Sequence, residues 1–233
     1  MLKNLFTIIF CFLVFAVSTN AQENKTTETI KRQEAKTVQK ANQRPSEPAV
    51  KPEPFDGVDV KTMAAKCVVF ETEKGNIKME MFPESAPNTV RNFLNLVTTN
   101  ALDTTTFGRV VPDFVIQGGD LWSSKNLTND LKWRAVRTIP DEPNLIKHER
   151  GILSMARSEE PNSATTSFFI LLREAATLDG KFAAFGRVTQ GMEIVEEINN
   201  LPVENEKPKE PVRINKAKIE PCPAENTASS IKQ

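Results

Sequence analysis

The stretch Phe107-Gly-Arg-Val-Val-Pro-Asp-Phe-Val-Ile-Gln-Gly-Gly-Asp120 is the most informative part of this 233-residue chain. Its apolar residues are typical of buried strands, yet they surround Arg109 and lead to Gln117 and a pair of glycines. A charged guanidinium is costly in a dry core unless it is paired or faces a cleft. The stretch therefore predicts an apolar pocket with a few fixed hydrogen-bond donors. Such a pocket suits a ligand with an apolar ring and amide groups.

The sequence on both sides of this stretch predicts many short strands and two helices. The first helix, which Ser85 would cap, has apolar residues at i, i+3, i+4 and i+7 from Val90. The predicted strands are 66–72, 77–81, 106–111, 114–117, 152–156, 168–172, 182–188 and 212–220, and the predicted helices are 86–98 and 191–200. Many strands with only two helices favour a barrel or a sandwich. Because Cys67 opens the first strand and Cys222 follows the last, the ends can meet, which favours a closed barrel.

The composition excludes several kinds of function. Thirty basic and thirty acidic residues produce no net field that would attract nucleic acid. The sequence has three cysteines without a Cys-x-x-Cys pair, no histidine cluster and no glycine-rich nucleotide-binding motif. The one histidine, His148, lies in a charged turn that we expect at the surface. We therefore expect no metal, no cofactor and no nucleic-acid partner.

The first 21 residues have the pattern of a secretory signal peptide. A positive start precedes an apolar run from Leu5 to Val17, and small residues follow before Gln22. This run of about 13 apolar residues is shorter than the roughly 20 that a membrane-spanning helix needs, which argues against a permanent anchor. We expect residues 1–21 to be cleaved and the mature chain to be exported without stable membrane insertion.

Composition divides the remaining chain into three parts. Residues 22–60 are rich in charged residues and proline and too poor in apolar residues to fold, which predicts a disordered tether. Residues 61–223 have the composition of one globular domain, and residues 224–233 are expected to be a flexible tail. In an exported protein, Cys67 and Cys222 could form a disulfide across neighbouring strands, or they could remain two buried free thiols.

Four blocks of the sequence, in order and spacing, resemble the cyclophilins. Residues 107–120 resemble the cyclophilin signature, in which Phe-His-Arg-Val leads to Phe-x-x-Gln-Gly-Gly. The other blocks are Ala86-Pro-Asn-Thr-Val-Arg-Asn-Phe93, Gly151-Ile-Leu-Ser-Met-Ala156, and Leu178-Asp-Gly-Lys followed by Phe185-Gly-Arg-Val-Thr-Gln-Gly191. The resemblance covers nearly all of residues 66–222. The run Asn162-Ser-Ala-Thr-Thr-Ser-Phe-Phe-Ile170 is most similar to exported bacterial members, so we expect a periplasmic or secreted location.

The resemblance implies a mainly β fold, a closed eight-stranded antiparallel barrel capped by two α-helices. It also implies a peptidyl-prolyl cis–trans isomerase that acts on proline-containing unfolded or extended polypeptides, and a monomer is the default expectation. Arg109 takes the position of the catalytic arginine. The residues implied to bind the substrate peptide are Phe114, Val115, Gln117, Ala156, Arg157, Phe169, Leu178 and Phe182.

Several positions depart from the family pattern. Gly108 replaces a histidine, Ser167 a glutamine, Thr177 an aromatic residue and Phe182 a histidine. The segment 121–138 lacks the usual glycines and contains Trp122 and Trp133, which we expect to pack within this loop. Two hypotheses follow: an active isomerase with altered substrate preference, or a proline-peptide binding or chaperone module with weakened catalysis.

Overall fold

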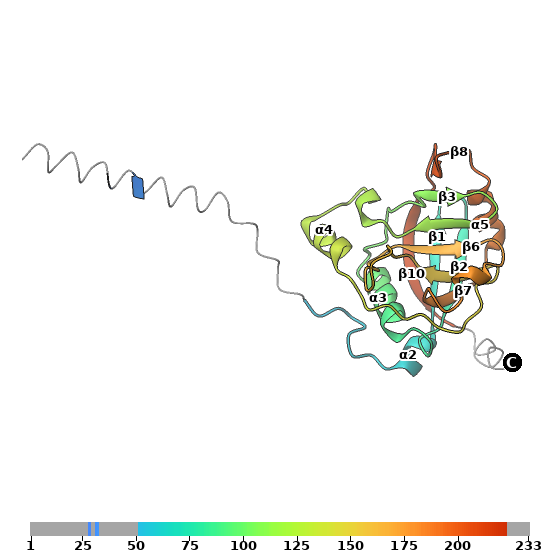
Figure 1. The fold of residues 1–233 in the computed structure, drawn as a ribbon, viewed down its shortest axis with the longest axis horizontal. Helices are drawn as coiled ribbons and strands as arrows, with labels where there is room; N and C mark the ends of the chain where they lie inside the picture. Colours follow the sequence, from blue (N-terminus) through green and yellow to red (C-terminus); the bar gives the residue numbers. More distant parts are fainter. Residues whose placement is uncertain (1–27, 29–30, 33–50, 223–233) are drawn as a thin grey trace, which may run out of the picture. The chain divides into compact units, whose positions relative to one another are not determined.

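The structure is a computed structural model that describes residues 51–222 and, before them, residues 28, 31 and 32 (Figure 1). Eight strands form one antiparallel sheet in the order β10-β1-β2-β7-β5-β6-β4-β3. They are β1 (Lys66–Thr72), β2 (Asn76–Met81), β3 (Arg109–Val111), β4 (Val115–Gly118), β5 (Ile152–Met155), β6 (Phe168–Leu171), β7 (Ala184–Gln190) and β10 (Ile214–Pro221). Each of these strands overlaps one that the sequence predicts.

The sheet curls until its edge strands β3 and β10 approach each other. Between these edges the structure has one β-bridge, Thr106 to Arg213, instead of a ladder. Two hydrogen bonds flank the bridge: the Phe107 amide donates to the Val212 carbonyl at 2.9 Å, and the Ile214 amide to the Thr105 carbonyl at 2.8 Å. The predicted mainly β, eight-stranded antiparallel fold is confirmed, although the barrel is not strictly closed, because this last seam is short.

Helix α3 (Pro87–Thr98) packs its apolar side against the barrel interior. Phe93 is buried, and its ring centroid lies 5.4 Å from that of Phe168 and 5.0 Å from that of Phe185, both in edge-to-face contact. Burying a phenylalanine contributes about 1.5–3 kcal/mol, and aromatic pairs add to this. Helix α5 (Met192–Asn199) buries Val195 and Ile198 in the same cluster. Both predicted helices are therefore present.

The cap that we predict for α3 is wrong. The residue before the helix is Ala86, which makes no side-chain capping bond, rather than Ser85. The Glu142 carboxylate caps the helix instead, accepting the backbone amides of Asn88 at 2.9 Å and Thr89 at 2.7 Å. A carboxylate at this end satisfies free N–H groups and complements the helix dipole. Because Glu142 is 54 residues away from Asn88 in the chain, local sequence rules do not identify it.

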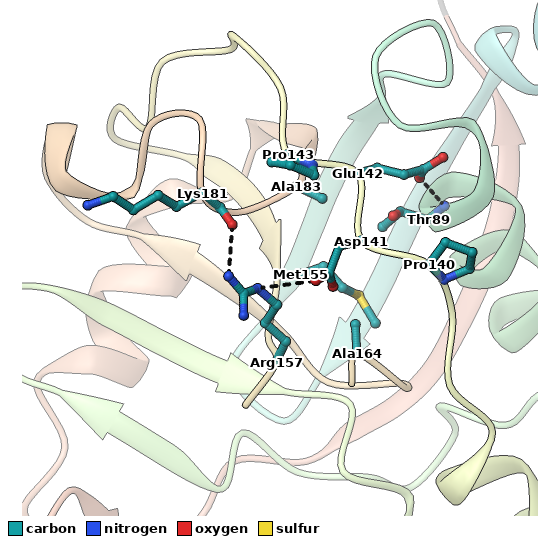
Figure 2. A pocket seen from close by; sticks show the side chains of 10 residues that line it. All are labelled: Thr89, Pro140, Asp141, Glu142, Pro143, Met155, Arg157, Ala164, Lys181 and Ala183. Atoms are coloured by element: carbon teal, nitrogen blue, oxygen red, sulfur yellow. Dashed lines mark hydrogen bonds and ion pairs between the residues drawn. The ribbon is translucent and has the colours of Figure 1, made fainter. Parts of the chain in front are cut away.

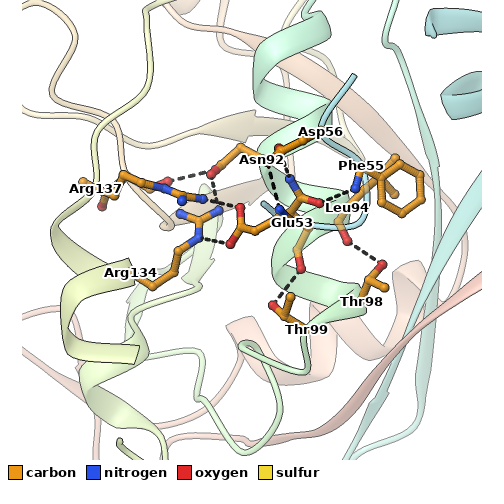
Figure 3. A network of polar contacts seen from close by, with 11 residues as sticks. Glu53, Phe55, Asp56, Asn92, Leu94, Thr98, Thr99, Arg134 and Arg137 are labelled. Atoms are coloured by element: carbon orange, nitrogen blue, oxygen red, sulfur yellow. Dashed lines mark hydrogen bonds and ion pairs between the residues drawn. The ribbon is translucent and has the colours of Figure 1, made fainter. Parts of the chain in front are cut away.

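Residues 51–60 belong to the folded unit, which corrects the predicted end of the tether at residue 60. The Glu53 carboxylate accepts a hydrogen bond from Arg134 Nε at 2.8 Å and also pairs with Arg137 (Figure 3). The Phe55 amide donates to Asn95 Oδ1 at 2.7 Å. A short helix, α2 (Val60–Ala64), then leads into β1. The tether predicted for residues 22–50 lies outside the described residues, apart from residues 28, 31 and 32.

The segment 121–138 folds into a 3₁₀ turn, η1 (Leu121–Ser123), and a helix, α4 (Asn129–Val136), neither of which the sequence predicts. Trp133 is partly buried, whereas Trp122 is 53% exposed, so the expected packing role is wrong for Trp122. The other elements not predicted are helix α2, a second 3₁₀ turn, η2 (Ala176–Leu178), and a hairpin of β8 (Val203–Glu204) and β9 (Lys207–Pro208).

A disulfide joins Cys67 and Cys222, with 5.0 Å between their Cα atoms. This bridge, rather than two free thiols, ties the start of β1 to the residue after β10. A disulfide restricts the unfolded chain and so typically adds about 2–4 kcal/mol to the free energy of unfolding. Within residues 51–222 and the three described residues before them, no helix has the length and apolar character to cross a membrane. The predicted signal peptide (residues 1–21) and tail (residues 224–233) lie outside the described residues.

Candidate active site

Strand register places three predicted site residues in one row. Arg109 on β3 is paired directly with Gln117 on β4, and Gln117 is paired with Phe169 on β6. Directly opposed residues of neighbouring strands project from the same face of a sheet. The second glycine of the pair after this row is required by the geometry. Gly119 has φ +82°, and a Cβ there would lie 2.4 Å from the Thr166 carbonyl oxygen.

An apolar cluster separate from the barrel interior lies beside this row. Successive residues of β4 and β6 alternate between the two faces: Ile116 and Ile170 belong to the interior, whereas Val115 and Phe169 belong to this second cluster. The predicted site residues that pack in or against it are Phe114, Val115, Ala156, Phe169, Leu178 and Phe182. The structure thus brings together residues from four separate parts of the chain.

The cluster is only partly covered. Val115 and Phe169 are buried, whereas Phe114, Leu178 and Phe182 are half-buried. The rings of Phe169 and Phe182 meet edge to face, with 6.0 Å between centroids. A half-covered apolar surface next to an arginine and a glutamine is the kind of site that the sequence predicts.

Arg109 lies at the rim of this surface, with its side chain 44% exposed. Its Nη1 donates to Gln117 Oε1 at 3.3 Å, and its Nε donates to Glu206 Oε2 at 2.7 Å. A guanidinium has five N–H donors, so these two bonds leave others for a substrate. Glu206 is a further residue of the site, which no sequence pattern indicates. Glu206 lies 97 residues from Arg109, in a hairpin that no predicted strand covers.

Arg157, the remaining predicted residue, connects the site to a small cavity (Figure 2). Its guanidinium carbon lies 5.1 Å from the centre of the Phe182 ring, a cation–π distance. The cavity measures about 10 Å³, the room that one water molecule needs. Of the nine predicted site residues, only Arg157 lines it, so it is not the predicted proline pocket.

His148 is buried, which corrects the expectation that it lies at the surface. Its Nδ1 is 3.1 Å from Asp179 Oδ1 and its Nε2 is 3.0 Å from Ser154 Oγ. A neutral imidazole with its proton on Nδ1 donates to Asp179, and its Nε2 then shares the single Ser154 hydroxyl proton with the Ala183 carbonyl, which lies 3.0 Å from Ser154 Oγ. Although serine, histidine and aspartate are the residue types of a nucleophilic triad, Ser154 has no exposed surface from which to attack a substrate.

Burial favours the neutral form of His148, and the neighbouring carboxylate favours the charged form. Burial lowers the pKa of His148 below its ordinary value of 6.5, although the Asp179 carboxylate opposes this shift. Hydrogen bonds from the His148 backbone amide and the Lys147 side chain lower the pKa of Asp179 to about 2. Because Asp179 directly follows Leu178, and Ser154 is paired with Phe169 in the sheet, this network lies beside the candidate site.

Gly108 and Thr177, which replace larger residues of the family pattern, are both exposed. A Cβ added at Gly108 would meet nothing closer than Thr106 Oγ1 at 3.8 Å, so the backbone there does not require glycine. The Ser167 carbonyl accepts the Ala156 amide at 3.0 Å, which links β6 to the end of β5. None of these three residues lies within one of the eight strands that support the site.

The fold and this row of residues define a barrel of the cyclophilin type. A crystal structure of a cyclophilin-type peptidyl-prolyl cis-trans isomerase from Cryptosporidium parvum matches 68% of this chain and 99% of its own, with a TM-score of 0.60 and 29% identity. A second crystal structure of that protein, in the presence of the dipeptide Ala-Pro, has a TM-score of 0.59 and 30% identity, and the match covers 66% of this chain and 98% of that one.

The family model of the cyclophilin-type peptidyl-prolyl cis-trans isomerases matches residues 67–219, and the chain belongs to this family. A peptidyl-prolyl cis-trans isomerase of Acinetobacter baylyi is 34% identical over 173 residues, which cover 70% of this chain and 89% of the relative. The peptidyl-prolyl cis-trans isomerase A of Dickeya dadantii is 35% identical over 164 residues, which cover 65% of this chain and 83% of that relative.

Proposed function

We propose that this chain catalyses the cis–trans isomerisation of Xaa-Pro bonds in exported polypeptides, with Arg109 as its catalytic residue. The observation that carries this proposal is the row Arg109–Gln117–Phe169 beside a half-covered apolar cluster. The cluster has the character needed to hold a proline ring, and Gln117 and the backbone at Ala156 can bind the flanking peptide. The Ala-Pro dipeptide present with the Cryptosporidium parvum relative supports a proline-containing substrate.

The chemistry follows from the electronic structure of the peptide bond. Rotation faces a barrier of about 18–20 kcal/mol because the nitrogen lone pair is delocalised into the carbonyl group. In the twisted transition state this lone pair is localised on the prolyl nitrogen, where a donor from Arg109 stabilises it more than in the planar ground state. Lowering the barrier by about 6–7 kcal/mol corresponds to a rate factor on the order of 10⁵.

The proposed export rests on two observations. The first 21 residues have the pattern of a signal peptide, and the Cys67–Cys222 disulfide is typical of oxidising compartments. We propose that the mature chain acts in the periplasm, or as a secreted protein, of a bacterium. We also propose that it acts as a monomer, since one chain supplies every residue of the row and the cluster.

A cis–trans assay on a short Xaa-Pro peptide tests the activity, with Arg109→Ala as the decisive variant. We expect turnover by the unmodified protein and a loss of about 100- to 1,000-fold in kcat/KM in the variant, the usual effect of removing one transition-state donor. Thermal unfolding should change little, because the Arg109 side chain is half-exposed and lies outside the barrel interior. Equal turnover by both proteins would show that Arg109 is not the catalytic residue.

One observation favours the second candidate function, a proline-peptide binding or chaperone module. The guanidinium of Arg109 is already paired with the Glu206 carboxylate, which offsets part of its charge. An unmodified protein that binds proline peptides but isomerises them at the uncatalysed rate would establish this second function and overturn the first.

A further inference from the structure

The β8–β9 hairpin places a carboxylate against Arg109 through a strained turn. Val203 is paired with Pro208 and Glu204 with Lys207, so Asn205 and Glu206 form a two-residue turn. Their φ angles are +51° and +63°, as in a type I′ turn. The second position of this turn favours glycine, because a side chain there is disfavoured. Glutamate is therefore a costly residue at position 206.

The backbone of Glu206 is tied to the strand that carries Arg109. The Val110 amide donates to the Glu206 carbonyl at 2.8 Å. Because Val110 is the next residue after Arg109, this bond fixes the position of the turn relative to the arginine. The side chain of Glu206 then accepts from Arg109 Nε at 2.7 Å.

Glu206 and Gln117 contact different nitrogens of the same guanidinium. Gln117 accepts from Nη1 at 3.3 Å, and Glu206 accepts from Nε. A half-exposed arginine held at a single point would sample many rotamers, whereas two acceptors fix the plane of its planar fork. The remaining N–H groups are thereby kept in a constant orientation at the edge of the apolar cluster.

We infer that Glu206 is a positioning residue for Arg109: its carboxylate orients the guanidinium for donation to the prolyl nitrogen. This inference rests on the proposed function. A well-oriented donor lowers the barrier without changing how tightly the substrate binds, so the loss of Glu206 should reduce kcat and leave KM nearly unchanged.

The test separates this role from a merely structural one by means of Glu206→Gly. Glycine suits the turn, so this variant should unfold at the same temperature or higher, yet its kcat should fall about 10-fold, as expected for a misoriented donor. Glu206→Gln retains an acceptor of the same shape and should stay within about threefold of the unmodified kcat. The matched control is Glu204→Gln, which removes a charge from the same hairpin at an exposed residue and should change nothing.

Combining Glu206→Gly with Arg109→Ala completes the test. If Glu206 acts through Arg109, the double variant should be no slower than Arg109→Ala alone, since coupled residues are not additive. Additive losses would overturn the inference, and so would a kcat for Glu206→Gly equal to or above that of the unmodified protein. In each of those cases the unmodified protein remains active and the proposed function stands. An inactive unmodified protein would overturn both.

Discussion

The two hydrophobic clusters share the same strands but are built differently. Inside the barrel, Phe93, Phe168 and Phe185 are fully buried and make edge-to-face contacts. On the other face lies the second cluster, called the outer cluster below, around Val115 and Phe169. There Phe114 and Phe182 remain half-exposed, and an arginine lies over each ring, with Arg173 over Phe114 and Arg157 over Phe182. The interior gains stability from every apolar group that it covers, whereas the outer cluster leaves apolar surface and cations accessible. This difference supports the proposal that the outer cluster binds the proline-containing peptide.

The largest expected effect comes from breaking the interior cluster. Phe93→Ala should lower the free energy of unfolding by about 3–5 kcal/mol, because it removes a buried ring and leaves a cavity among close-packed neighbours. Urea unfolding measures this loss. The activity of the fraction that remains folded should change little, since Phe93 is on α3 and outside the outer cluster. A selective loss of activity without a loss of stability would contradict this comparison.

Truncating a side chain in the outer cluster should affect substrate binding more than stability. Phe182→Ala should raise KM for an Xaa-Pro peptide about 5- to 20-fold, which corresponds to the roughly 1–2 kcal/mol of an apolar side chain that is only partly buried. The free energy of unfolding should fall by at most about 1 kcal/mol, because the ring is only partly buried. Phe182→Leu, which retains apolar volume, should have a smaller effect on KM. A KM unchanged in both variants would exclude Phe182 from the substrate surface.

The smallest expected effect is a dependence of stability on pH that His148 introduces. Because its pKa is lowered in the folded protein, the unfolded chain binds a proton first as the pH falls below 6.5. The stabilisation is therefore complete above pH 6.5 and decreases as the pH falls from there toward the lowered pKa. Asp179, whose pKa is lowered from 3.8 to about 2, adds a second decrease between these two values.

Thermal unfolding between pH 8 and pH 5 would measure the histidine effect. The unmodified protein should lose stability below about pH 6.5, and His148→Gln should have a flat profile over the same range, since the chain contains one histidine. Whatever its absolute stability, a His148→Gln variant that retains the full pH slope would show that another group is responsible.

Sequence patterns predicted those features that depend on neighbours in the chain. Short apolar runs located all eight strands of the sheet, and the helical spacing from Val90 located α3, because each of these patterns lies within a single element. The motif around Arg109 and Gln117 could be recognised for the same reason, since both lie within one hairpin of 107–120. The resemblance to the cyclophilins supplied the other site residues, which no local pattern connects.

Tertiary structure alone determined the polar partners. Glu142 rather than Ser85 caps α3, His148 is buried between Asp179 and Ser154, and Glu206 holds Arg109. Between 6 and 97 residues separate the side chains in these contacts. A charged or polar residue shows no periodicity that reveals its partner, so composition alone suggests that it faces water. Only when the strands bring distant residues together does a carboxylate, an imidazole or a guanidinium find the group that pairs with it, because burial without such a pair would cost too much free energy.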